Sequence, residues 1–185
     1  MTRQTTFKAL AMAAFAGVYS MCALASGARA ANVQPVACEQ KDAALPAPMT
    51  AWAQETVALR AAALPAVAAK AVLVLGHKAD VALQPAASVT MALKPEKALV
   101  ADHPHSGLLA LRIPTAGSYR IIVGTNAWID VVAGGKLVSS SAFGDNPKCS
   151  TIRKFVVFPL KPGMVTVQLS GVSADHIDVL AVRED

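Results

Sequence analysis

Residues 165–170 read VTVQLS, an alternation of apolar and polar side chains with a period of two. Successive side chains of a β-strand point to opposite faces, so this segment presents one apolar face and one polar face. Upstream, KFVVF at 154–158 is apolar on both faces, as a strand covered by two layers would be. Together the two segments predict a half-buried strand and a central strand in a layered β-structure.

Short β-branched runs separated by turn residues recur every ten or so positions from Ala71 onward, a spacing typical of β-sandwiches. The clearest hairpin joins 127–132 (AWIDVV) to 136–140 (KLVSS) through Gly134 and Gly135, which accept the positive φ of a tight turn. We expect an all-β fold, an antiparallel β-sandwich or jelly roll of roughly seven to nine strands. Its predicted core contains Tyr119, Ile121, Trp128, Phe155, Val157, Val165, Val167 and Leu169.

Two segments share one layout: LRIPTAGSYRI at 111–121 and FPLKPGMVTV at 158–167. Each has a strand end, a Pro-containing turn closed by Gly, and then an alternating strand. The repetition supports antiparallel pairs and predicts a turn type that recurs within one sandwich.

The first thirty residues have the layout of a secretory signal peptide. Arg3 and Lys8 precede an apolar run over 9–25, and ARA at 28–30 ends it with a small-x-small cleavage site. The run falls short of the roughly 20 residues that a membrane-spanning helix prefers. We therefore expect residues 1–30 to be cleaved, no integral membrane segment to remain, and the protein to be periplasmic or secreted.

Charge argues against a nucleic-acid partner. The chain has 17 basic and 12 acidic residues, but Arg3, Lys8 and Arg29 belong to the leader. The remaining 14 basic residues are scattered among the acidic ones and leave a net charge of +2. Binding to nucleic acid needs clustered Lys and Arg that displace counterions.

Two cysteines follow the leader, Cys38 and Cys149. An oxidising compartment makes a disulfide between them the expected state. It would tie an Ala/Pro-rich N-terminal arm, residues 31–70, to the β-sandwich domain, residues 71–185. The alternative, a metal or redox site, lacks a C-x-x-C motif and a nearby histidine.

Histidines offer two weak metal signals. His103 and His105 flank a proline next to Asp102, and His176 and Asp178 lie two apart, on one face of a strand. The second pair matches the local part of a 2-His-1-carboxylate iron site, whose third ligand would come from His77, His103 or His105. A polar loop and a solvated strand edge are the ordinary alternatives.

A binding surface is predicted near Trp128. Trp128 and Asp130 alternate onto the same strand face, and together with Arg153 they offer an aromatic platform beside charged groups. The sequence favours the other interpretation of this pair, a core tryptophan at a sheet end with its carboxylate at the rim. A hydrolase is unsupported, because no G-x-S-x-G motif and no other nucleophile constellation occurs.

Four segments, GSYR at 117–120, AWIDVV at 127–132, CSTIRK at 149–154 and PLKPG at 159–163, together resemble a family of small exported bacterial proteins. Some of these carry the name homogentisate 1,2-dioxygenase although they are far shorter than that enzyme. Members often have histidines a few residues before the position of Cys149, where this chain has AFGD at 142–145. More loosely, the chain is similar to sandwich modules appended to secreted peptidases and to carbohydrate-binding domains.

Two functions follow as predictions. The first is an exported, non-catalytic binding or accessory module without a cofactor, whose partner is a small molecule, a glycan or a periplasmic protein. The alternative, implied by the family name, is a small metal-dependent oxygenase that uses iron. Since the sequence shows one H-x-D and one H-x-H spacing and no stronger metal motif, we favour the binding module.

Overall fold

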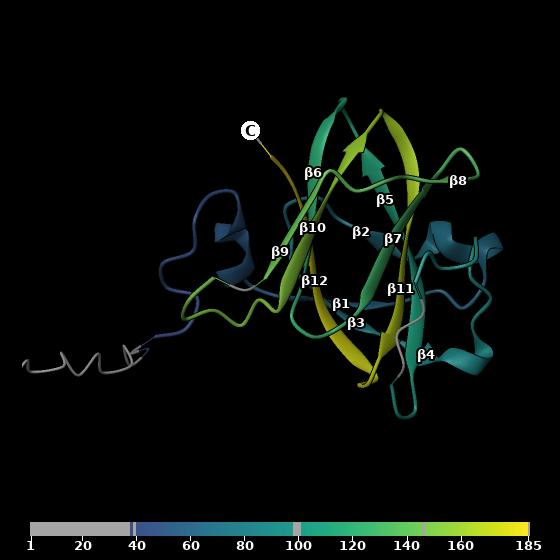
Figure 1. Ribbon diagram of the computed structural model, residues 1–185, viewed down its shortest axis with the longest axis horizontal. Coiled ribbons are helices and arrows are strands. Elements are labelled where there is room, and N and C mark those ends of the chain that lie inside the picture. The colour runs from purple at the N-terminus through teal and green to yellow at the C-terminus, as the bar shows by residue number, and fades with distance from the viewer. Residues whose placement is uncertain (1–37, 39, 98–100, 146, 185) are drawn as a thin grey trace, which may run out of the picture. The chain divides into compact units, whose positions relative to one another are not determined.

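Residues 38, 40–97, 101–145 and 147–184 are described by a computed structural model. The expected signal peptide, residues 1–30, and the start of the arm lie outside the described residues. In the described part, two β-sheets face each other (Figure 1). The expected all-β sandwich is confirmed, with twelve strands among the described residues.

The first sheet has six strands in the order β1-β3-β12-β6-β10-β9. In that order they are β1 (Val57–Arg60), β3 (Ala79–Ala82), β12 (His176–Arg183), β6 (Gly117–Val123), β10 (Lys154–Leu160) and β9 (Ala142–Asp145). The second sheet has the order β2-β5-β11-β7-β8, with β4 also paired to β5. Its strands are β2 (Val72–Leu73), β5 (His105–Ile113), β11 (Gly163–Val172), β7 (Trp128–Ala133), β8 (Lys136–Leu137) and β4 (Gln84–Pro85).

Two strand pairs are parallel, β1 with β3 and β2 with β5, whereas the other pairs are antiparallel. Between β1 and β3 the chain crosses to the second sheet, where it forms β2. When it returns to the first sheet, β3 runs in the same direction as β1, and the two strands pair in parallel. Three of the strands have only two residues. Such short edge strands carry too little periodicity to be predicted, and this explains why the strand number exceeds the expected seven to nine.

Both Pro-containing turns connect the two sheets. One leads from β5 to β6 and the other from β10 to β11 (Figure 1). The strands that each turn joins do not pair with each other. Instead β6 pairs with β10, with Tyr119 opposite Phe158, and β5 pairs with β11, with Leu111 opposite Val165. The shared layout in the sequence therefore marks two equivalent corners of the sandwich.

The predicted hairpin is confirmed. Gly134 and Gly135 connect β7 to β8 with φ angles of 56° and 75°, which non-glycine residues rarely adopt. Leu137 lies opposite Val132 across the pair.

The main core fills the space between the sheets, and most of the predicted core is confirmed. Six of the eight predicted residues are buried: Tyr119, Ile121, Val157, Val165, Val167 and Leu169. Trp128 and Phe155 are only partly buried, and this corrects the prediction. Both side chains line an open pocket, so apolar character alone did not distinguish a core position from a pocket wall.

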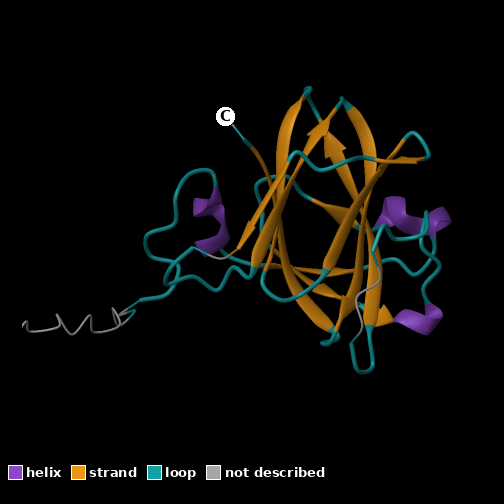
Figure 2. Cartoon of the chain, viewed as in Figure 1, coloured by secondary structure: helices purple, strands orange, loops and turns teal. Residues whose placement is uncertain are grey.

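A second, smaller core lies against the first sheet. It joins Met49 and Trp52, from the 3-10 helix η1 (Met49–Ala53), to Ile122, Leu180 and Val182. The other two 3-10 helices, η2 (Pro65–Lys70) and η3 (Ala86–Ser88), contact β5 instead, so helices flank both sheets (Figure 2). No helix in the described part of the chain has the length and hydrophobicity that crossing a membrane requires.

The expected disulfide is present. Cys38 and Cys149 are bonded, with 5.3 Å between their Cα atoms. The bond closes a loop over 111 positions and ties the segment before η1 to the loop between β9 and β10. Part of the expected arm, Val57–Arg60, is itself a strand of the first sheet.

Candidate functional site

A pocket of about 380 Å³ opens between β7 of the second sheet and β9 and β10 of the first. Pockets of this size hold small molecules in many proteins. Glu96 and Lys97, which precede β5, and Ser140, which precedes β9, complete its rim. The strands contribute Trp128, Ile129, Asp130, Phe143, Gly144, Asp145, Lys154, Phe155, Val156 and Phe158.

Trp128 and Asp130 form the polar centre of this pocket. They share one face of β7, as the alternation of a strand predicts, and the indole N–H of Trp128 donates a 2.8 Å hydrogen bond to Oδ1 of Asp130. The expected burial is reversed, however. The carboxylate is 96% buried, whereas the indole is partly exposed, so the tryptophan forms the wall and the aspartate lies beneath it.

Asp130 has an unused acceptor. Its Oδ2 atom is buried and has no hydrogen-bond partner among the described residues. Burial raises the pKa of this carboxyl above its ordinary value, because the charged form is poorly solvated. A buried polar atom without a partner is costly, and a ligand that donates a hydrogen bond would remove the cost.

Two ammonium groups lie over the ring of Trp128. The Nζ atom of Lys154 is 5.5 Å from the ring centroid, and that of Lys97 is 5.7 Å away. Both distances fall within the range of cation–π attraction. The pocket therefore combines an aromatic wall with two positive charges.

Lys154 is the better enclosed of the two lysines, since it is half-buried at the start of β10. Loss of solvation lowers the pKa of its ammonium group, and the neighbouring charge of Arg153 adds to the effect. Among the described residues, no carboxylate lies within 4.0 Å of its Nζ atom. Its positive charge has no direct partner there.

Arg153, the third residue of the predicted binding surface, is exposed and does not line the pocket. Its Nη1 atom lies 3.3 Å from Oδ1 of Asp145, which does line it. The structure thus brings Trp128 and Asp130 together and places Arg153 behind the wall, where it neutralises a rim carboxylate.

Comparison of this chain with protein-family models and with curated proteins gives no match. The pocket is therefore interpreted from its geometry and chemistry. Membership of the exported bacterial family that the sequence resembles stays a prediction.

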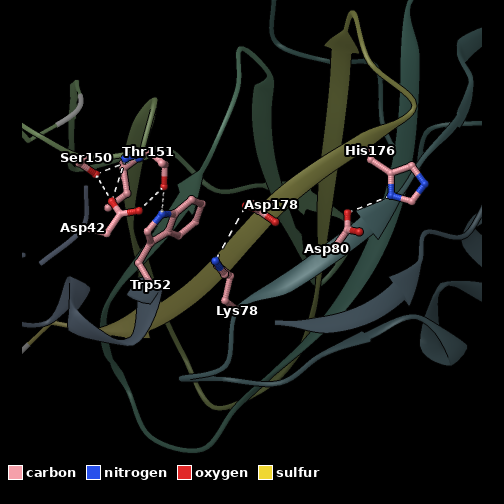
Figure 3. Close-up of polar contacts among 9 residues, drawn as sticks. Asp42, Trp52, Lys78, Asp80, Ser150, Thr151, His176 and Asp178 are labelled. Carbon is pink, nitrogen blue, oxygen red and sulfur yellow. Dashed lines mark hydrogen bonds and ion pairs between the residues drawn. The ribbon is translucent and has the colours of Figure 1, made fainter. Parts of the chain in front are cut away.

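His176 and Asp178 lie on one strand, β12, but each faces a different partner (Figure 3). The Nδ1 atom of His176 lies 2.9 Å from Oδ1 of Asp80, and Asp178 lies 4.0 Å from the ammonium group of Lys78. The hydrogen bond to Asp80 and the charge of that carboxylate raise the pKa of the exposed imidazole. These contacts describe two polar pairs on the face of the sheet.

His103 and His105 lie before and at the start of β5, beside Pro85 and Ala86. The Nδ1 atom of His105 is buried without a hydrogen-bond partner among the described residues. Within the described residues, no three His, Cys, Asp or Glu side chains are grouped to hold a metal ion. The alternative iron site, with two histidines and one carboxylate, stays a prediction.

Sequence reasoning missed the charged and aromatic partners of Trp128. Lys97 and Phe143 come from segments with no recognisable motif, and Lys154 was interpreted only as the start of a central strand. Their approach to Trp128 depends on how the two sheets stack. One local signal existed for Lys154. It is the first residue of an apolar strand, so its charge must lie at that end of the strand.

Proposed function

We propose that this chain is an exported, non-catalytic binding module that holds a small molecule in the pocket beside Trp128 and Asp130. The observation that carries the proposal is an open, aromatic-walled pocket lined by Asp130, a residue whose buried Oδ2 atom lacks a hydrogen-bond partner among the described residues. A rigid sandwich that presents a few polar groups in an apolar pocket is a common design for ligand binding.

Export is part of the proposal. The Cys38–Cys149 disulfide supports a periplasmic or secreted location, because such bonds persist mainly in oxidising compartments. The expected leader, residues 1–30, points to the same location. N-terminal sequencing of the native protein tests this part: we expect a start near Ala31, and a start at Met1 or Thr2 would contradict it.

A blocking variant tests the binding role. Ser140 lies on the pocket rim and is exposed, whereas the neighbouring Ser139 is exposed but does not line the pocket. We expect Ser140→Phe to fill the pocket and Ser139→Phe to leave it open. Both variants and the unaltered protein are titrated with a panel of sugars, amino acids and short organic acids, and Trp fluorescence reports binding.

The expected result is at least one compound whose affinity falls at least tenfold in Ser140→Phe and stays unchanged in Ser139→Phe. If every binder tolerates both substitutions, the pocket is not the binding site and the proposal fails. Metal analysis of protein purified without a histidine tag gives a second test. Stoichiometric iron that is lost in His176→Ala or His103→Ala would favour the oxygenase instead.

A further inference from the structure

We propose that the pocket selects small organic acids that have an apolar body and a carboxylate. This inference rests on the proposed function and specifies its ligand class. Two observations carry it: the ammonium groups of Lys97 and Lys154 lie near Trp128 without a direct carboxylate partner, and the walls next to Trp128 are apolar.

The two lysines that line the pocket have no direct carboxylate partner among the described residues. Lys97 and Lys154 both lie near the ring of Trp128, and no described carboxylate lies within 4.0 Å of either Nζ atom. Of the three acidic residues that line the pocket, Asp145 is paired with Arg153, and Asp130 is buried and bonded to Trp128. The third, Glu96, is exposed to solvent.

A ligand carboxylate would supply the missing partner of Lys154. This ammonium group is half-buried, so it has already lost part of its hydration. A charge-assisted hydrogen bond to a carboxylate is stronger than a neutral one, and it strengthens as water is excluded. Lys97 lies near the same ring and adds attraction for the same anion.

The rest of the wall is apolar. Ile129 and Phe158 are buried behind it, Phe155 is partly exposed, and Phe143 is 82% exposed at the edge strand β9. An aromatic side chain that exposed gains free energy when an apolar ligand covers it. The body of the ligand is therefore expected to be hydrocarbon.

Two other ligand classes fit less well. A sugar needs a free aromatic face on which to stack, but the ring of Trp128 already has two ammonium groups over it. An organic cation would meet the same two charges and be repelled.

A ligand series on the unaltered protein tests the charge requirement. Octanoate, octanamide and octyltrimethylammonium share one apolar chain and differ in charge, and calorimetry measures their affinities. We expect octanoate to bind at least tenfold more tightly than the amide and the cation to bind least. If the amide or the cation binds as tightly as octanoate, the inference is overturned.

A matched pair of variants tests the role of Lys154. Lys154→Met keeps a long unbranched side chain and removes its charge, and Lys161→Met makes the same change just after the opposite end of β10, outside the pocket. We expect octanoate affinity to fall at least tenfold in Lys154→Met only. Equal affinities in the two variants would overturn the inference.

The failures of the two proposals are distinguishable. If the sugar and amino-acid panel yields a ligand that Ser140→Phe blocks, while octanoate does not bind, the binding module stands and the acid class is wrong. If neither octanoate nor any panel compound is sensitive to Ser140→Phe, the binding module itself is wrong.

Discussion

Asp42 binds Thr151 through both of its carboxylate oxygens. Oδ1 accepts a 2.8 Å hydrogen bond from the backbone N–H of Thr151, and Oδ2 accepts one of 2.5 Å from its hydroxyl. The hydroxyl of Ser150 also donates to Oδ1, and the hydroxyl of Thr151 accepts a bond from the indole of Trp52 (Figure 3). A single carboxylate thus links the start of the chain's described part to the disulfide loop.

Replacing Asp42 with alanine should destabilise the protein. The change removes the acceptor of the backbone N–H of Thr151 and of two hydroxyls. Because both bonds to Thr151 are exposed and water can replace the carboxylate there, we expect a loss of about 1 kcal/mol in the free energy of unfolding. Urea unfolding measures the loss. The exposed Asp102→Ala variant is the control, and equal stability of the two variants would show that the contacts of Asp42 contribute nothing.

The carboxylate of Asp42 should also make the free energy of unfolding depend on pH. Burial opposes its ionisation, but hydrogen bonds from Thr151 and Ser150 outweigh burial and lower the pKa of Asp42 below 3.8. Its contribution is therefore complete above about pH 4 and is lost as the pH falls through the lowered value. We expect the stability difference between the unaltered protein and Asp42→Ala to shrink between pH 5 and pH 2. A constant difference over this range would contradict the prediction.

Asp130 should have the opposite effect on how stability depends on pH. Burial raises its pKa, so the native state resists ionisation that the unfolded chain undergoes near pH 4, and stability is lost as the pH rises through the raised value. We expect Asp130→Asn to gain stability relative to the unaltered protein between pH 3 and pH 7, by on the order of 1 kcal/mol. Urea unfolding at both pH values tests this. Asp102→Asn corrects for the removal of a charge, and no relative gain would contradict the prediction.

Loss of the disulfide should weaken the whole domain. The bond closes a loop over 111 positions, and we expect the double variant Cys38→Ser, Cys149→Ser to lose about 2–4 kcal/mol of stability. Thermal unfolding under non-reducing conditions measures the change. Reducing agent should lower the melting temperature of the unaltered protein and leave that of the variant unchanged; an equal response of both would argue against the bond.

Gly107 should not tolerate a side chain. A Cβ atom on this residue of β5 would lie 2.4 Å from Cβ of Ala61, in the segment that follows β1. We expect Gly107→Ala to cost about 1–3 kcal/mol through overpacking. Gly117→Ala is the control, because its nearest neighbour is the flexible end of Arg183. If both variants unfold at the same urea concentration, the close approach of Ala61 is not limiting.

The sandwich was predictable because several of its strands and turns can be recognised from short stretches of sequence. The alternation at 165–170 and the paired glycines at 134–135 are local signals, and they located a strand and a hairpin correctly. The expected polar face of the strand is not exposed, however: Gln168 and Ser170 are buried, and Gln168 exchanges hydrogen bonds with the backbone of Leu93. For residues 55–63 the sequence allowed either a short helix or a strand, and the structure has the strand Val57–Arg60 there. The sequence could not decide between them, since prolines flank the segment and its burial follows no alternation. Its place depends on a parallel partner, Ala79–Ala82, that lies nineteen or more residues away.

The candidate site was predictable only in part. Trp128 and Asp130 share a face because they are two residues apart on one strand, and that relation is local. Lys97 and Phe143 reach the pocket from other segments, and no spacing in the sequence relates them to Trp128. Which of Trp128 and Asp130 is more buried also depends on the segments that cover β7, and these are distant in the sequence.

The loop that carries Cys149 joins β9 to β10, and both strands form a wall of the pocket. Among the described residues β9 is an edge strand that pairs with β10 alone, so the covalent bond in the loop that follows it should limit how far that wall can open. If the pocket binds a ligand as proposed, its affinity should therefore depend on the oxidation of the two cysteines. Protein that matures in a reducing environment would retain the residues of the pocket, and we expect it to bind the ligand more weakly until the disulfide forms.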